Sequence, residues 1–243
     1  NNMKEILIKE YNNLVKKPIP FKIPKNTFHV DFIKGGKFEV LGKNKKRYKV
    51  KFIDQKTNDV VYESTITNNM WCKTAAKYFV DYRIQAIDLE TNNIEFDYTF
   101  DAKNKDVYMH FASKAIGDTL AWFPYAEEFR KKHNCKLTIS TFHNEWFESL
   151  YPNIKFVEPG SDQFNLYAMY EIGWHYNEDD SINFDCNPSD FRKYPLQKTS
   201  SEVLGLDYKE IKPKLTFKNT GSTIKGDYVV IAPHGSAHAK YWN

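Results

Sequence analysis

The sequence predicts an α/β protein in which a small antiparallel β barrel or sandwich precedes a doubly wound α/β domain. Two observations predict this fold class. Between about Thr27 and Phe100, apolar and polar residues alternate at a spacing of two, which is typical of half-buried strands. After Asp106, short apolar runs alternate with helical segments, as the crossovers of a parallel sheet require. A hydrophobic content of 41% is enough to build cores for both parts.

Residues 1–26 predict a helical leader. Apolar side chains recur there at steps of three and four residues, which places them on one side of a short helix that ends before Pro18. Charged residues interrupt the apolar positions near the start, so we expect no secretory signal peptide. No later stretch approaches the length of a membrane span, and we therefore expect a cytoplasmic protein that does not cross a membrane.

Residues 27–105 are assigned to the antiparallel β domain. Short alternating segments are separated there by turn signals, and such spacing is typical of a small barrel or sandwich. The turn signals are Gly35-Gly36, Gly42-Lys43-Asn44, Thr57-Asn58-Asp59 and Thr91-Asn92-Asn93. Residues 1–105 hold 20 Lys and Arg against 13 Asp and Glu, but these charges are scattered along predicted strands. Solvated strand faces explain that pattern, so we expect no nucleic-acid partner.

Residues 106–243 are assigned to a Rossmann-like domain. The run 107–112 has the apolar character of a buried parallel strand, and Gly117-Asp118 opens a helix that continues to about Lys132. Residues 161–200 are less regular and rich in Asn, Asp, Tyr and Pro, and we interpret them as a strand plus a long surface excursion. The other strands and helices of this domain are expected at 137–140 (strand), 144–150 (helix), 154–157 (strand), 200–206 (helix) and 228–232 (a final buried strand). Their order is that of half of a doubly wound fold.

Neither the cysteines nor the glycines predict a cofactor. Cys72, Cys135 and Cys186 are far apart, odd in number and without the spacing of zinc ligands, so we expect no metal and no disulfide framework. The glycine-rich fingerprint of dinucleotide-binding folds and the P-loop motif are both missing from the sequence. Dehydrogenase and NTPase functions are therefore not indicated.

Two loops carry the candidate chemistry, because ligands meet an open parallel sheet at the carboxyl ends of its strands. The first runs from Ser113 to Asp118, and the second runs from Pro233 to Lys240. Asp118 has two interpretations: a helix N-cap that accepts amide hydrogens, or a catalytic carboxylate. The residues alone favour the cap, and Lys240 alone is typical of a solvated lysine.

Four stretches resemble the autotransporter strand-loop-strand O-heptosyltransferase family. They are 68–71 (Asn-Asn-Met-Trp), 114–125 (Lys-Ala-Ile-Gly-Asp-Thr-Leu-Ala-Trp-Phe-Pro-Tyr), 166–174 (Leu-Tyr-Ala-Met-Tyr-Glu-Ile-Gly-Trp) and 236–243 (Ser-Ala-His-Ala-Lys-Tyr-Trp-Asn). The Gly-Asp-Thr-Leu-Ala-Trp core is the specific part, and the resemblance runs from about Phe38 to the last residue. More distantly, the two loops are similar to those of the lipopolysaccharide heptosyltransferase superfamily.

The resemblance implies a GT-B architecture, in which two Rossmann-like domains face each other behind an N-terminal β domain. It implies an ADP-heptose donor, serine hydroxyls of an autotransporter-type protein as acceptors, and inversion at the anomeric carbon. Asp118 is then the general base, and Lys240 stabilises the leaving diphosphate. Further substrate-binding candidates are Ser113, Lys114, Gly117, Thr119, His234, Ser236 and His238.

The second GT-B domain is missing from this sequence, which we therefore interpret as a fragment that is inactive alone. An alternative function is a non-catalytic module that binds the acceptor or assembles an oligomer. The expected partners are the acceptor protein, ADP-heptose and further copies of the same chain. A longer reading frame with a second Rossmann-like domain favours the transferase, whereas one that ends at Asn243 favours the binding module.

Overall fold

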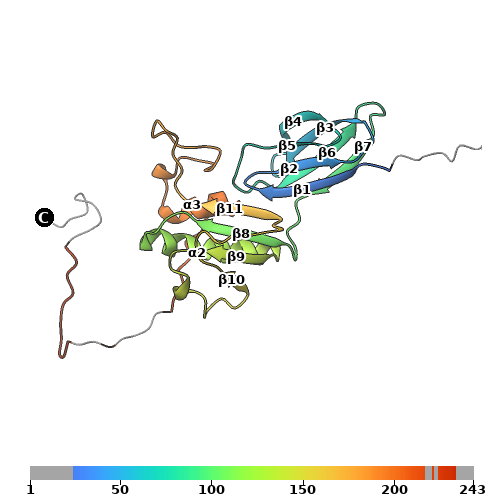
Figure 1. Cartoon of the computed structure of the whole chain (residues 1–243). Coiled ribbons are helices and arrows are strands. Elements are labelled where there is room, and N and C mark those ends of the chain that lie inside the picture. Colours follow the sequence, from blue (N-terminus) through green and yellow to red (C-terminus); the bar gives the residue numbers. More distant parts are fainter. Residues whose placement is uncertain (1–23, 217–220, 222–223, 234–243) are drawn as a thin grey trace, which may run out of the picture.

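The structure, a computed structural model, describes residues 24–216, 221 and 224–233, so nearly all of the predicted helical leader lies outside the described residues. The described residues form two β-sheets with a few helices, which confirms the α/β class (Figure 1). The strands are β1 (Thr27–Ile33), β2 (Lys37–Leu41), β3 (Arg47–Asp54), β4 (Asp59–Thr67), β5 (Met70–Lys73), β6 (Tyr82–Asp88), β7 (Ile94–Thr99), β8 (Asp106–Phe111), β9 (Lys136–Ser140), β10 (Ile154–Phe156) and β11 (Ala168–Ile172). The helices are α2 (Ile116–His133) and α3 (Leu196–Val203), with 3₁₀ turns η1 (Asn144–Trp146) and η2 (Phe191–Lys193).

The smaller sheet is antiparallel, with the strand order β4-β3-β6-β7. Every second residue of β3 is buried, at Tyr48, Val50 and Phe52, as the two-residue alternation predicts. The turns 54–59 and 88–94 contain Asn58 and Asn92 at φ values of 62° and 63°. Asparagine tolerates this left-handed conformation better than most residues, which explains why these turns close the hairpins.

The larger sheet is mixed, with the order β10-β9-β8-β11-β1-β2-β5. Its strands from β10 to β1 are parallel, and β2 and β5 continue it in antiparallel fashion. The register places Phe32 of β1 opposite Ala168 of β11, so a strand from the predicted β domain extends the parallel sheet. The separation into domains 27–105 and 106–243, and the barrel or sandwich, remain predictions.

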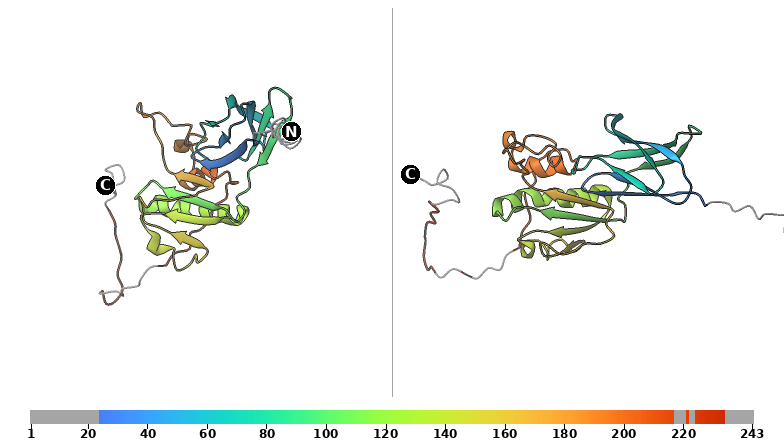
Figure 2. Two further views of the ribbon diagram at one scale, coloured as in Figure 1. Left: turned by 45° about the vertical axis from the view of Figure 1, so that its right-hand side comes forward. Right: turned by 45° about the horizontal axis from the view of Figure 1, so that its top comes forward.

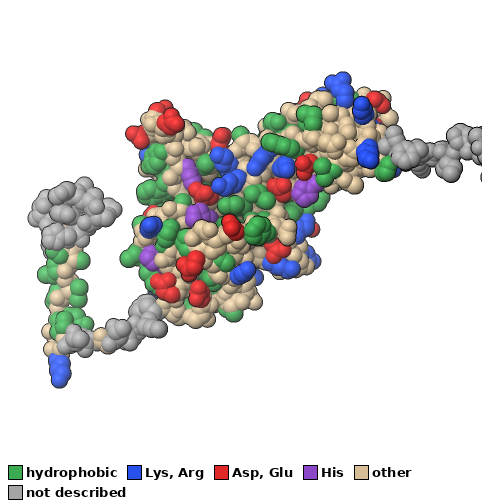
Figure 3. All heavy atoms as spheres, viewed as in Figure 1, with side chains coloured by type: hydrophobic (Ala, Val, Ile, Leu, Met, Phe, Trp, Pro, Cys, Tyr) green, Lys and Arg blue, Asp and Glu red, His purple; other side chains and the backbone are tan. Residues whose placement is uncertain are grey.

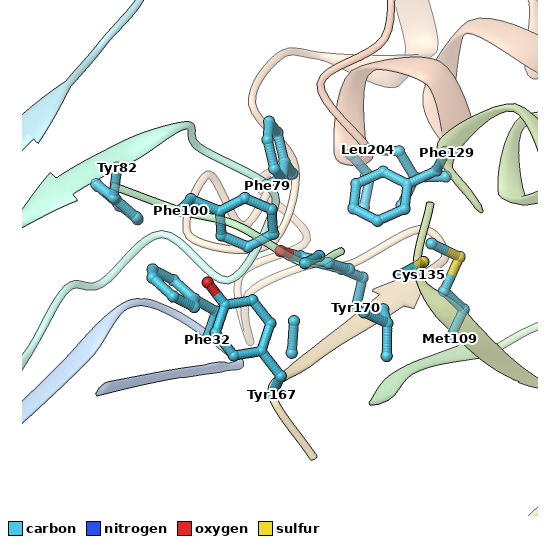
Figure 4. Packing of buried hydrophobic residues seen from close by; sticks show 14 of the residues in the cluster. Phe32, Phe79, Tyr82, Phe100, Met109, Phe129, Cys135, Tyr167, Tyr170 and Leu204 are labelled. Carbon is cyan, nitrogen blue, oxygen red and sulfur yellow. The ribbon is translucent and has the colours of Figure 1, made fainter. Parts of the chain in front are cut away.

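An aromatic cluster joins the two sheets (Figure 4). The Phe32 ring centroid lies 4.9 Å from that of Phe100 and 5.2 Å from that of Tyr167, and Phe79 lies 5.5 Å from Phe129 of α2. These contacts connect β1, the segment after β7, the segment before β11 and the long helix. The core is therefore continuous between the four-stranded sheet and the helices. Figure 2 (right) shows the blue and teal strands toward one end of the molecule and the green and orange helices toward the other.

Three predicted elements differ from the structure. The helix predicted at 200–206 begins earlier, at Leu196, and the helix predicted at 144–150 is reduced to the single turn η1. The buried strand predicted at 228–232 is wrong: these residues form no strand, and Val229 is 86% exposed. Their β-branched composition favours a strand, but a strand also needs a hydrogen-bonding neighbour and a covering layer.

Candidate active site

The parallel strands bring several loops to one edge of the larger sheet. β8, β9, β11 and β1 all run in the same direction, so the loops that follow them share the carboxyl edge. Ser113, Lys114, Gly117, Asp118 and Thr119 lie there, in and just after the loop between β8 and α2. Lys240, His234, Ser236 and His238 lie outside the described residues, and the expected approach of Asp118 to Lys240 therefore remains a prediction.

Asp118 lies in the first turn of α2, and it is not the N-cap. The N-cap is Ala115, three residues earlier, and α2 begins at Ile116. The interpretation of Asp118 as an N-cap is therefore wrong. Its side chain is half-buried, and in the described part of the chain no hydrogen-bonding or ionic partner contacts its carboxylate. The helix N-terminus favours a negative charge at this position.

Two residues near Asp118 hold the turn by hydrogen bonds, and Gly117 leaves open space beside the backbone. Ser113 Oγ accepts a hydrogen bond from the amide of Ala115 at 3.1 Å, which holds the turn before the helix. Thr119 is fully buried, and its hydroxyl donates to the Ala115 carbonyl at 3.3 Å. A Cβ added at Gly117 would meet no atom within 4 Å, so no packing contact requires glycine at this position.

The next loop holds the Asp118 loop in place. His143 Nε2 donates to the Lys114 carbonyl at 3.1 Å, and the His143 ring stacks on Trp146 with centroids 4.0 Å apart. Asn144, which is buried, donates from Nδ2 to the Val157 carbonyl at 2.9 Å. The loops after β8, β9 and β10 are thus connected by direct contacts, which gives Asp118 a defined setting.

Other residues noted in the sequence have structural roles. His110 Nδ1 hydrogen-bonds to Ser140 Oγ at 3.0 Å, which joins β8 to β9. Trp122 is buried and donates from Nε1 to the Leu196 carbonyl at 3.2 Å, which ties α2 to α3. Trp174 is 48% exposed beside it, with centroids 6.4 Å apart.

Sequence reasoning missed a second group of polar residues at the same edge. Glu171 of β11 and His175 lie 3.6 Å apart (Oε1 to Nε2), beside a cavity of about 210 Å³. The available signal was the position of Glu171 near the end of a strand parallel to β8. A larger cavity, of about 620 Å³, lies by Lys132 and His133 at the opposite end of α2 and contains none of the predicted site residues.

The described residues contain no group of three or more His, Cys, Asp and Glu side chains that could hold a metal ion. Neither described helix combines the length and apolar character that crossing a bilayer requires. The three cysteines are free thiols, and burial raises the pKa of Cys135 to about 11 and that of Cys72 to about 12.

No protein-family model matches the chain. Three curated relatives are autotransporter heptosyltransferases by name. Aah of Escherichia coli is 35% identical over 205 residues, which cover 82% of this chain and 50% of Aah. TibC of E. coli O78:H11 is 30% identical over 223 residues, which cover 90% of this chain and 52% of TibC. BimC of Burkholderia thailandensis, named as inactive, is 28% identical over 196 residues, which cover 79% of this chain and 45% of BimC.

The fold is similar to two crystal structures of TibC. One, described as an iron-containing dodecameric glycosyltransferase, superposes with a TM-score of 0.72 at 25% identity, covering 94% of this chain and 58% of TibC. The other, in complex with ADP-D-β-D-heptose, has a TM-score of 0.76 at 26% identity and the same coverage. This chain thus spans about half the length of these relatives. The iron of TibC differs from our expectation of no metal, and the described residues do not provide a site that fits iron.

Proposed function

Because this chain is a homologue of the autotransporter heptosyltransferases over about half of their length, we propose that it is the catalytic-base half of a protein O-heptosyltransferase. The donor is ADP-heptose, which TibC binds. The acceptors are serine hydroxyls of an autotransporter-type protein. The single observation that carries this proposal is the Asp118 carboxylate, which lies at the carboxyl edge and has no hydrogen-bonding or ionic partner among the residues that the structure describes.

The proposed reaction is one displacement with inversion. The serine Oγ forms a bond to the anomeric carbon as the bond from that carbon to the diphosphate breaks. The serine proton passes to the Asp118 carboxylate, and ADP leaves with the bonding electrons. Lys240 is proposed to stabilise the charge that gathers on the diphosphate, because a fixed ammonium favours that charge as it develops.

The surroundings of Asp118 support a base rather than a structural carboxylate. Asp118 lies beside the carboxyl edge of the parallel strands, where ligands meet an open sheet. The open space beside Gly117 lets a substrate approach the backbone of this turn closely. Ser113 and Lys114 are proposed to shape the acceptor side, and the His143 contact fixes the carbonyl of Lys114. Thr119 is proposed to position the first turn of α2 and not to contact the substrate, because its hydroxyl donates to the Ala115 carbonyl.

The test is transfer of heptose to a passenger protein. The full-length protein is co-expressed with a serine-bearing autotransporter passenger in cells that make ADP-heptose, and the passenger is measured by intact-mass and peptide mass spectrometry. We expect added heptose on serine residues. A passenger that stays unmodified with the full-length protein present would contradict the proposal.

A second candidate function is a non-catalytic module that binds the acceptor or assembles an oligomer. BimC, a relative named as inactive, favours it. This function predicts stable passenger binding by the full-length protein without sugar transfer, so the same co-expression distinguishes the two. We also propose a homo-oligomer, because TibC is dodecameric, and a cytoplasmic location.

A further inference from the structure

A second polar pocket lies at the carboxyl edge, at the ends of β1 and β11. It is lined by Lys34, Lys77, Glu171, His175 and Cys186 and has a volume of about 210 Å³. Figure 3 shows histidine, lysine and acidic side chains gathered on this face, over the end of β11. We call it the Glu171–His175 pocket.

Hydrogen bonds between Asn187 and the backbone around His175 hold this residue in position. Its amide donates to Oδ1 of the buried Asn187 at 3.2 Å, and Nδ2 of Asn187 donates to the Gly173 carbonyl at 3.0 Å. A Cβ added at Gly173 would lie 2.8 Å from the Ala112 Cβ and 3.3 Å from His175 Nε2. Glycine therefore lets the imidazole lie beside Ala112, where the loop to Asp118 begins. The Glu171–His175 pocket and the Asp118 loop are neighbours.

The polar groups of this pocket are incompletely paired. His175 Nε2 is buried and has no hydrogen-bond partner among the described residues, and an oxygen of the Glu171 carboxylate lies 3.6 Å away. Lys34 Nζ lies 3.8 Å from the other oxygen of Glu171. Burial lowers the pKa of His175, so its ring is neutral near pH 7 and offers both a donor and an acceptor nitrogen. An unpaired buried polar atom is costly, and a ligand that supplies its partner removes that cost.

We propose that the Glu171–His175 pocket binds hydroxyl groups of the sugar of the donor. This inference rests on the proposed function and names further residues for it. A hydroxyl donates and accepts at once, so it can donate to Glu171 or His175 while it accepts from Lys34 or Lys77.

Other ligand classes match the pocket less well. A phosphate would meet the Glu171 carboxylate, and an apolar group would supply no partner for the buried Nε2 of His175. The volume of about 210 Å³ is below the roughly 300–1,000 Å³ of sites for whole ligands, which fits a sugar rather than a complete nucleotide sugar.

The test compares the affinities of ADP and ADP-heptose for the full-length protein by calorimetry. Wild type, Glu171→Gln, His175→Gln and the control His29→Gln are measured. The His29 ring also lies near a carboxylate, 3.7 Å from Asp31, but its side chain is 58% exposed. We expect wild type and the control to bind ADP-heptose more tightly than ADP. In the two pocket variants this preference falls about 10-fold, the size of one or two lost hydrogen bonds, while the affinity for ADP is unchanged.

The outcomes separate the two proposals. If all four proteins show the same preference for ADP-heptose over ADP, the pocket does not bind the sugar and the inference is overturned, but the proposed function stands. Wild type that binds neither ligand contradicts the proposed function itself. Thermal unfolding of the same variants shows whether they are folded, and an unfolded Gln variant is replaced by Lys34→Met, for which the same loss of preference is expected.

Discussion

Charged side chains are paired near the C-terminal end of α2, whereas the acidic side chain in its first turn is not paired with any described residue. Near the C-terminus, Glu127 and Arg130 form a bidentate pair at 2.6 and 2.9 Å, and Asn134 caps the helix at a φ of 47°. At the N-terminus, Asp118 has no such partner in the described residues, and Gly117 faces open space. Paired charges contribute to stability, whereas an unpaired carboxylate at a helix start is available to a substrate. Stability and function are therefore separated along one helix.

The largest change in the free energy of unfolding is expected for Glu127→Ala. Glu127 is 9% exposed, so its removal leaves the largely buried guanidinium of Arg130 without its partner. We expect a loss of about 3 kcal/mol in urea unfolding, with sugar transfer unchanged where the protein is folded. The neighbouring Glu128→Ala is the matched control, because Glu128 pairs at the surface with Lys131 and Lys209. Glu128→Ala should lower the free energy of unfolding by less than about 1 kcal/mol. Equal losses in the two variants would contradict the claim that the Glu127–Arg130 pair stabilises this end of the helix.

A smaller loss of stability is expected at acidic pH, from a histidine at the same end of α2. Burial lowers the pKa of His133 from 6.5 to about 4, and Lys132 adds to the lowering. Between these values the unfolded state binds a proton that the folded state does not, so stability falls as the pH falls from about 6.5 to about 4. Wild type should lose on the order of 1 kcal/mol more than His133→Phe over that range, allowing for partial exposure. Urea unfolding at several pH values measures this, and parallel curves would show that His133 does not contribute.

The smallest of these changes in the free energy of unfolding is expected for Gly117→Ala. Unlike the two preceding changes, it is a gain in stability. Alanine favours the helix over glycine by roughly 0.5–1 kcal/mol, and the added Cβ meets no atom within 4 Å. The protein should become slightly more stable while transfer falls about 10-fold, since the methyl group takes space that the substrate needs. Melting temperature and transfer rate are measured on the same sample. Full activity in a stabilised variant would mean that the substrate does not approach Gly117.

Local patterns predicted much of the fold and only part of the site. The alternation in β3 and the strand and helix that flank Asp118 follow from the spacing of apolar residues. The pairing of β1 with β11 does not, because it joins segments more than 130 residues apart, such as Phe32 and Ala168. The start of α2 was also missed, since aspartate is a common N-cap and Ala115 is not a typical one. The position of His175 beside Glu171 was also missed, because it depends on hydrogen bonds between the backbone of residues 173–175 and the distant Asn187.

The most direct test of the account is the rate of transfer by Asp118→Asn in the full-length protein. The substitution keeps the size of the side chain and removes its ability to accept the serine proton. Because Asp118 is not a cap and has no partner among the described residues, the free energy of unfolding should change by no more than roughly 1 kcal/mol, the usual contribution of a charge at a helix end. Single-turnover transfer with saturating ADP-heptose and passenger should fall about 10²–10⁴-fold. Transfer at the wild-type rate would contradict the assignment of Asp118 as the base.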